Sequence, residues 1–116
     1  MSFTQDTEVT PCLMRVLPDG EVLAIFPTQA GGIDPTTCGC YAHVGQHSSC
    51  RPYSIVGRSR PATPAEYADL QKELEGSPYG YRLQFFKNTR GRRSRWERQR
   101  LAQINRAPAL HGPVGL

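Results

Sequence analysis

The chain of 116 residues has the length of a single domain with a modest core, and its formal net charge is +4. Only 38% of the residues are hydrophobic and no run of about 18 apolar residues occurs, which excludes a membrane-spanning helix. Because the N-terminal residues are polar and acidic, without the apolar centre of a secretory signal, we expect a cytoplasmic protein whose thiols stay reduced.

The charges are unevenly distributed along the chain. Residues 1–86 carry six basic and nine acidic side chains, a balance of −3, whereas residues 87–116 carry eight basic and one acidic side chain, a balance of +7. We therefore expect three parts: a flexible lead-in at residues 1–11, an α+β domain at residues 12–86, and a basic C-terminal extension from residue 87 to 116.

The first structured part is predicted to be a β-hairpin. Two β-favouring runs, residues 13–17 and 21–26, flank a Pro-Asp-Gly turn sequence at residues 18–20. Pro27 is expected to end the second strand, because proline cannot donate a ladder hydrogen bond.

Two further strands are predicted later in the chain. Residues 53–56 are rich in β-favouring side chains and are followed by Gly57. Residues 80–86 alternate aromatic and aliphatic side chains, which favours a final strand that completes the sheet.

The clearest element is a helix predicted over residues 64–75. Thr63 precedes Glu66 by three residues and Pro64 occupies the first helical position, which is the pattern of a capping box with a compatible proline. Gly76 provides a natural end. One apolar stripe runs along this helix, formed by Tyr67, Leu70 and Leu74.

A second helix is predicted at about residues 95–106, because Ser94 precedes Glu97 by three residues. The expected fold is therefore α+β: a small, mostly antiparallel sheet of three or four strands, one capped helix packed on it, and a basic C-terminal helix. The expected core consists of Leu13, Val16, Val22, Ile25, Tyr67, Leu70, Leu74 and Leu83.

A cluster of cysteines and histidines lies between the predicted strands. Zinc prefers four thiolate or imidazole ligands, and the spacing within this segment offers five candidates, although it matches no standard zinc finger. Two other interpretations stay open: buried structural side chains, or a Cys–His pair of a small hydrolase. The five candidates are Cys38, Cys40, His43, His47 and Cys50.

The same segment, YAHVGQHSSC, together with the preceding EVLAIFP and the following RPATPAEYADLQKELEG and YGYRL, resembles a family of small bacterial proteins from plasmid, phage or mobile-element gene neighbourhoods. The resemblance covers about residues 12–86, and no activity comes with it. It implies that the Tyr-x-His-Val-Gly-Gln-His segment persists while the cysteines vary. The positions that match are Tyr41, His43, Gly45, Gln46 and His47, and the resemblance implies a hydrogen-bonded polar core there.

The basic extension carries the predicted function. Arginine binds phosphate with paired hydrogen bonds, and a tryptophan within an arginine-rich segment can stack on a base. We expect a non-enzymatic accessory protein that binds nucleic acid through Arg90, Arg92, Arg93, Arg95, Trp96, Arg98 and Arg100. The alternative is a protein-interaction module that meets an acidic protein surface or self-associates, as an inhibitor or structural component of a phage or mobile element; a zinc- or cysteine-dependent hydrolase ranks third.

Overall fold

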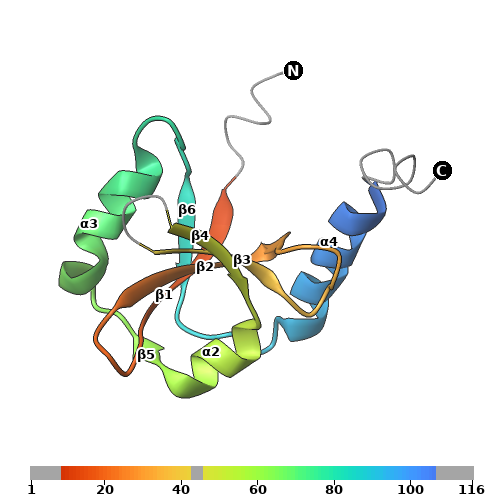
Figure 1. Ribbon diagram of the computed structural model, residues 1–116, viewed down its shortest axis with the longest axis horizontal. Coiled ribbons are helices and arrows are strands. Elements are labelled where there is room, and N and C mark those ends of the chain that lie inside the picture. Colours follow the sequence, from red (N-terminus) through yellow and green to blue (C-terminus); the bar gives the residue numbers. More distant parts are fainter. Residues whose placement is uncertain (1–8, 43–45, 107–116) are drawn as a thin grey trace.

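The structure is a computed structural model and describes residues 9–42 and 46–106. It is an α+β fold in which one mixed sheet lies between helices (Figure 1). The strand order is β4-β3-β2-β1-β5, and β6 pairs in parallel with β1 beside β5. The strands are β1 (Thr10–Val16), β2 (Val22–Ala30), β3 (Cys38–Ala42), β4 (Gln46–Cys50), β5 (Arg60–Pro61) and β6 (Leu83–Phe86). The helices of the described ranges are α2 (Pro52–Arg58), α3 (Pro64–Glu75) and α4 (Arg93–Arg106).

The predicted hairpin is confirmed as β1 and β2. Gly20 has a φ of +92°, in the left-handed region that favours glycine, and the Asp19 carboxylate accepts a hydrogen bond from the Glu21 backbone at 2.9 Å. The expectation that Pro27 ends the second strand is wrong. The register between β2 and β3 shifts after Phe26, and this irregularity lets β2 continue past the proline.

The segment with the cysteines forms a second hairpin, β3 and β4, where the sequence pattern indicates no strand. The strand predicted at residues 53–56 is also wrong, because these residues belong to α2. Pro52 stands at the start of this helix and Ile55 buries its side chain against the sheet. Packing of this one apolar residue outweighs the β-propensity of its neighbours.

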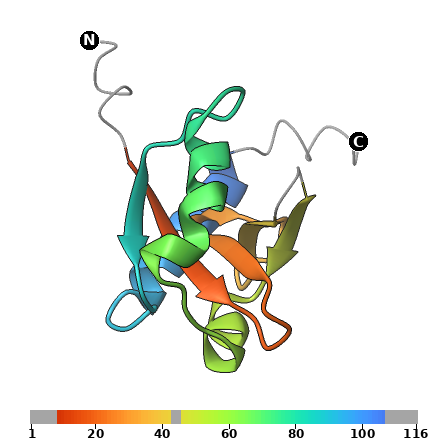
Figure 2. The same cartoon turned by 90° about the vertical axis from the view of Figure 1, so that its left-hand side faces the viewer.

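The helix predicted at residues 64–75 is confirmed as α3. The Thr63 hydroxyl accepts a hydrogen bond from the Glu66 backbone at 3.3 Å, and the Glu66 carboxylate accepts one from the Thr63 backbone at 2.9 Å. Helix α3 lies across one face of the sheet (Figure 2), where Leu70 and Leu74 are buried. That face also contributes Cys12, Met14, Ala24, Phe26 and Tyr41.

The opposite face of the sheet is covered by α2 and α4, so the sheet is a middle layer (Figure 1). Trp96 of α4 and Ile55 of α2 pack there against Leu13, Ile25, Cys38 and Cys40. Among the predicted core residues, Val22, Tyr67 and Leu83 are only partly buried, whereas the other five are buried. No helix in the described part of the chain is long and apolar enough to cross a membrane.

Candidate functional site

A short turn between β6 and α4 sets the position of the basic residues. Gly91 has a φ of +77°, and the Arg92 backbone donates a hydrogen bond to the Thr89 carbonyl at 2.9 Å. The Asn88 side chain accepts from the Arg90 backbone at 2.9 Å. Because Thr89 is itself buried, the turn is anchored to the body, and α4 begins two residues earlier than predicted.

Three exposed arginines at the start of α4 line a shallow hollow of about 380 Å³ together with Gly91 and Ser94. We call Arg93, Arg95 and Arg98 the arginine surface. Within the described residues, none of these three guanidinium groups has a carboxylate partner. The arginine surface therefore presents uncompensated positive charge to the solvent.

Aromatic rings orient two of the neighbouring guanidinium groups. The Arg93 guanidinium lies 3.5 Å from the ring centroid of Tyr53, whose hydroxyl donates to the Glu97 carboxylate at 3.3 Å. The Arg92 guanidinium lies 4.5 Å from the Phe86 centroid and donates to the Arg90 carbonyl, so it is partly occupied. Arg93 is thus held in place by stacking while its donors stay available.

Two residues predicted to contact a ligand are inside the protein instead. Trp96 is 4% exposed and packs edge-on against Phe86, with 5.2 Å between ring centroids. Arg100 is 1% exposed, and it donates to the Pro35 carbonyl at 2.8 Å and to the Pro27 carbonyl at 2.6 Å. Positions four residues apart share one helix side, and the docking of α4 turns that side inward. Trp96 and Arg100 are therefore corrected to structural residues.

The three cysteines of the predicted metal cluster share one face of the sheet. Cys38 is paired across the strands with Cys50, and their sulfur atoms are 4.0 Å apart. The Cys40 sulfur lies 3.0 Å from the Ser48 hydroxyl. A hydrogen bond with Cys38 and burial raise the pKa of the Cys50 thiol to about 12, and a hydrogen bond with Cys50 raises the pKa of Cys40. The thiols of Cys40 and Cys50 therefore stay protonated near neutral pH and are weak nucleophiles.

The histidines do not join the thiols. His47 is paired with Tyr41 and so lies on the face opposite to Cys38 and Cys40, because side chains alternate along a strand. His43 lies outside the described residues. Within the described ranges, no group of three or more His, Cys, Asp or Glu side chains is arranged to hold a metal ion. A bound zinc ion thus stays a prediction, and the described members of the proposed ligand set are not assembled around one point.

His47 belongs to a cluster of rings that links the second hairpin to the α3 side of the molecule. The centroids of Tyr41 and His47 are 4.7 Å apart, and the His47 Nε2 lies 3.3 Å from the Tyr79 hydroxyl. The fully buried Tyr41 donates its hydroxyl to the Glu73 carboxylate of α3. Tyr41 and His47 are therefore in ring contact, but Tyr41 alone of the described matching residues is buried, because Gln46 and His47 are exposed. The hydrogen-bonded polar core stays a prediction.

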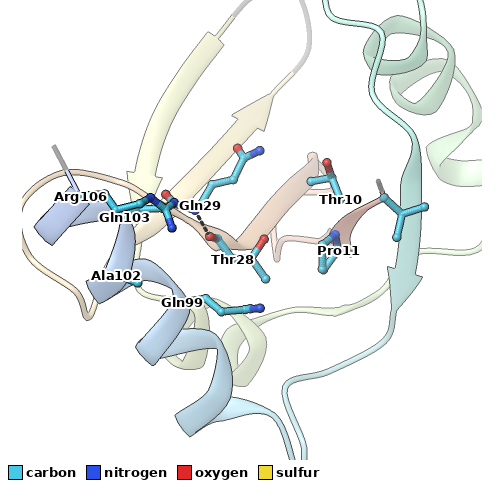
Figure 3. A pocket seen from close by; sticks show the side chains of 9 residues that line it. Thr10, Pro11, Thr28, Gln29, Gln99, Ala102, Gln103 and Arg106 are labelled. Atoms are coloured by element: carbon cyan, nitrogen blue, oxygen red, sulfur yellow. Dashed lines mark hydrogen bonds between the residues drawn. The ribbon is translucent and has the colours of Figure 1, made fainter. Parts of the chain in front are cut away.

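A polar cavity of about 500 Å³ lies between α4 and the ends of β1 and β2 (Figure 3). Gln103 closes its floor, because its amide donates to the Thr28 carbonyl and accepts from the Ala30 backbone. The amides of Gln29 and Gln99 have no hydrogen-bond partner among the described residues. The remaining lining residues are Val9, Thr10, Pro11, Ala102 and Arg106.

Local sequence patterns do not reveal this cavity, because it joins three segments that are far apart in the chain. The amide-rich run of α4, with glutamines at positions 99 and 103, is the available signal, but nothing in the sequence places it beside β2. Comparisons with protein-family models, with curated proteins and with solved structures find no match for this chain. The resemblance to small mobile-element proteins therefore stays a hypothesis.

Proposed function

We propose that this protein is a non-enzymatic, cytoplasmic accessory protein that binds nucleic acid through the arginine surface. The observation that carries the proposal is the hollow at the start of α4, where three exposed guanidinium groups surround one space and have no carboxylate partner among the described residues. Each guanidinium can offer a fork of donors to a phosphate, and their combined charge attracts a polyanion.

The position of these arginines within the helix supports the same function. The first turn of α4 contains no acidic residue, although the positive end of a helix dipole favours acidic side chains there. Arginines at this end repel the unpaired backbone N–H groups electrostatically. A phosphate placed in the hollow would interact favourably with both the arginines and the helix terminus.

The stacking of Arg93 on Tyr53 adds pre-organisation. A guanidinium that is already held at 3.5 Å over a ring loses less side-chain freedom on binding than a free one. The tyrosine hydroxyl is held in turn by Glu97, so the pair is fixed relative to α4. The arginine surface therefore combines one guanidinium group that is stacked on a ring with two exposed ones, those of Arg95 and Arg98.

The test is fluorescence anisotropy of labelled oligonucleotides over a range of salt concentrations. The double variant Arg95→Ala/Arg98→Ala should weaken binding and reduce the slope of log affinity against log salt by about 0.7 to 0.9 for each phosphate that the protein no longer neutralises. The matched control is Arg58→Ala/Lys72→Ala, which removes two exposed positive charges from α2 and α3 and should change affinity far less.

Two results would contradict the proposal. Equal decreases of affinity in the test and control variants would mean that only net charge matters and that the arginine surface is no site. Equal binding of an acidic polypeptide of matched charge, which competes with the oligonucleotide, would favour an acidic protein surface as the partner.

A further inference from the structure

We propose that the nucleic acid is single-stranded and that one of its bases enters the polar cavity between α4 and the ends of β1 and β2. This inference rests on the proposed function and names the form of nucleic acid that the same helix would bind. It assigns a base-binding role to Gln29 and Gln99, beside the phosphate-binding role of the arginine surface.

The cavity and the arginine surface are continuous along α4. Arg95 and Gln99 are four residues apart, as are Arg98 and Ala102, so each pair lies one helical turn apart on the same side. Arg106 follows Gln99 by seven residues and also lines the cavity. A strand that follows this side of the helix would pass from Arg98 to Arg106 over roughly 12 Å.

The interior of the cavity suits a nucleobase. Its volume of about 500 Å³ exceeds that of a planar base, and its walls combine the apolar surfaces of Pro11 and Ala102 with polar groups. A primary amide has both donors and an acceptor, so it can pair with the edge of a base and discriminate between bases. In Figure 3 the Gln99 side chain extends from α4 toward the strand that carries Pro11.

The amides of Gln29 and Gln99 are available to a ligand. Gln103 uses both ends of its amide on the β2 backbone, whereas Gln29 and Gln99 find no partner among the described residues. One glutamine of this group is therefore structural, and the other two, the half-buried Gln29 and the exposed Gln99, line the cavity with hydrogen-bonding capacity that faces solvent. Base recognition would satisfy that capacity with donors and acceptors of complementary pattern.

The shape of the site favours single strands. In a duplex the bases are stacked and present only their groove edges, so they cannot enter a concave cavity on a protein without leaving the stack. A single strand offers unpaired bases at little cost, while its phosphates stay available to the arginine surface. Binding of one unpaired base beside its phosphates requires a cavity for the base and a row of arginines for the phosphates on the same side of α4.

The experiment compares single-stranded oligo(A), oligo(C) and oligo(U), the corresponding DNA, and a duplex, with the full chain and with two variants. The wild type should bind single strands at least about tenfold more tightly than the duplex and should rank the homopolymers unequally. Gln29→Ala/Gln99→Ala should reduce the differences between homopolymers to about twofold or less while it preserves the salt slope. The matched control, Gln46→Ala/Gln71→Ala, removes two amides of β4 and α3 and should keep the wild-type ranking.

The outcomes separate this inference from the proposed function. If the duplex binds as tightly as the single strands, or if the homopolymers bind equally, while Arg95→Ala/Arg98→Ala still weakens binding, the base site is refuted and the phosphate surface stands. If no nucleic acid binds the wild type, both ideas are refuted. Far-ultraviolet circular dichroism and thermal melting of each variant show whether weaker binding reflects a disrupted fold.

Discussion

The two faces of the central sheet are stabilised in different ways. The face under α3 is built from apolar and aromatic side chains, and the hydroxyl of the buried Tyr41 donates there to Glu73. The face under α2 and α4 also contains an apolar cluster, but two arginines are buried in this layer, Arg15 and Arg100. Arginine therefore has two roles in this protein: buried arginines stabilise this layer, and exposed arginines present positive charge to the solvent.

Both buried arginines donate to main-chain carbonyl groups. Arg15 connects β1 with the end of α2 through the carbonyls of Val56 and Ser59, and it also reaches the carbonyl of Lys87 after β6. Burial lowers the pKa of Arg15, because the charged form loses hydration. Arg100 plays the corresponding role between α4, Pro27 within β2 and Pro35 in the chain after β2. In both places a guanidinium group connects segments that are not paired with one another in the sheet.

The largest expected effect comes from the tryptophan that docks α4. Trp96→Ala should lower the free energy of unfolding by about 4 kcal/mol, because the side chain is buried against Phe86 and its removal leaves a cavity. Urea denaturation followed by circular dichroism measures this change. Leu101 belongs to the same helix and is 43% exposed, so Leu101→Ala should cost less than about 1 kcal/mol. Similar decreases in the two variants would show that α4 does not dock as described.

The next largest expected effect on stability distinguishes a buried arginine of α4 from an exposed one. Arg100→Ala should destabilise the protein by about 3 kcal/mol, because the carbonyls of Pro27 and Pro35 lose their buried donor. Arg98→Ala, two residues earlier and exposed, should change stability by no more than about 0.5 kcal/mol. Chemical denaturation of both variants checks the contrast, and a stable Arg100→Ala protein would contradict the structural role.

A smaller effect is expected on the α3 face. Thr63→Ala should cost about 1 kcal/mol, since it removes the acceptor for the Glu66 backbone at the start of α3. Thr63→Ser keeps the hydroxyl and should stay close to the wild type. Thermal melting of the pair measures the difference, and equal melting temperatures for Thr63→Ala and Thr63→Ser would rule out a stabilising cap.

The smallest effect is a pH dependence at the same cap. Hydrogen bonds from Arg60 and from the Thr63 backbone lower the pKa of Glu66 from 4.5 to about 2. A lowered pKa in the folded state means that this contribution to stability is complete above about pH 4.5 and is lost as the pH falls toward 2. Glu66→Gln should therefore flatten the acid side of the stability profile. An unchanged slope between these pH values would show that the ion pair with Arg60 contributes nothing measurable.

The elements that sequence reasoning predicts correctly are those with local causes. The turn at Gly20 and the capping box of Thr63 and Glu66 depend on residues a few positions apart, so they can be predicted from the sequence. The strand expected at residues 53–56 is wrong, although Pro52 at a helix start and a basic residue in the last turn are helix signals. There, local propensities conflict and long-range packing of Ile55 decides.

The sequence by itself determined the α+β class, the first hairpin, α3 and the concentration of arginines near the C-terminal helix. Only the tertiary structure decided which arginines face solvent, because the docking of α4 turns Arg100 inward and leaves Arg98 outside. It also placed His47 and the cysteines on opposite faces, since pairing of β3 with β4 aligns Tyr41 with His47 and Cys38 with Cys50. Helix docking and strand register are long-range packing choices, so local sequence patterns do not encode them on their own.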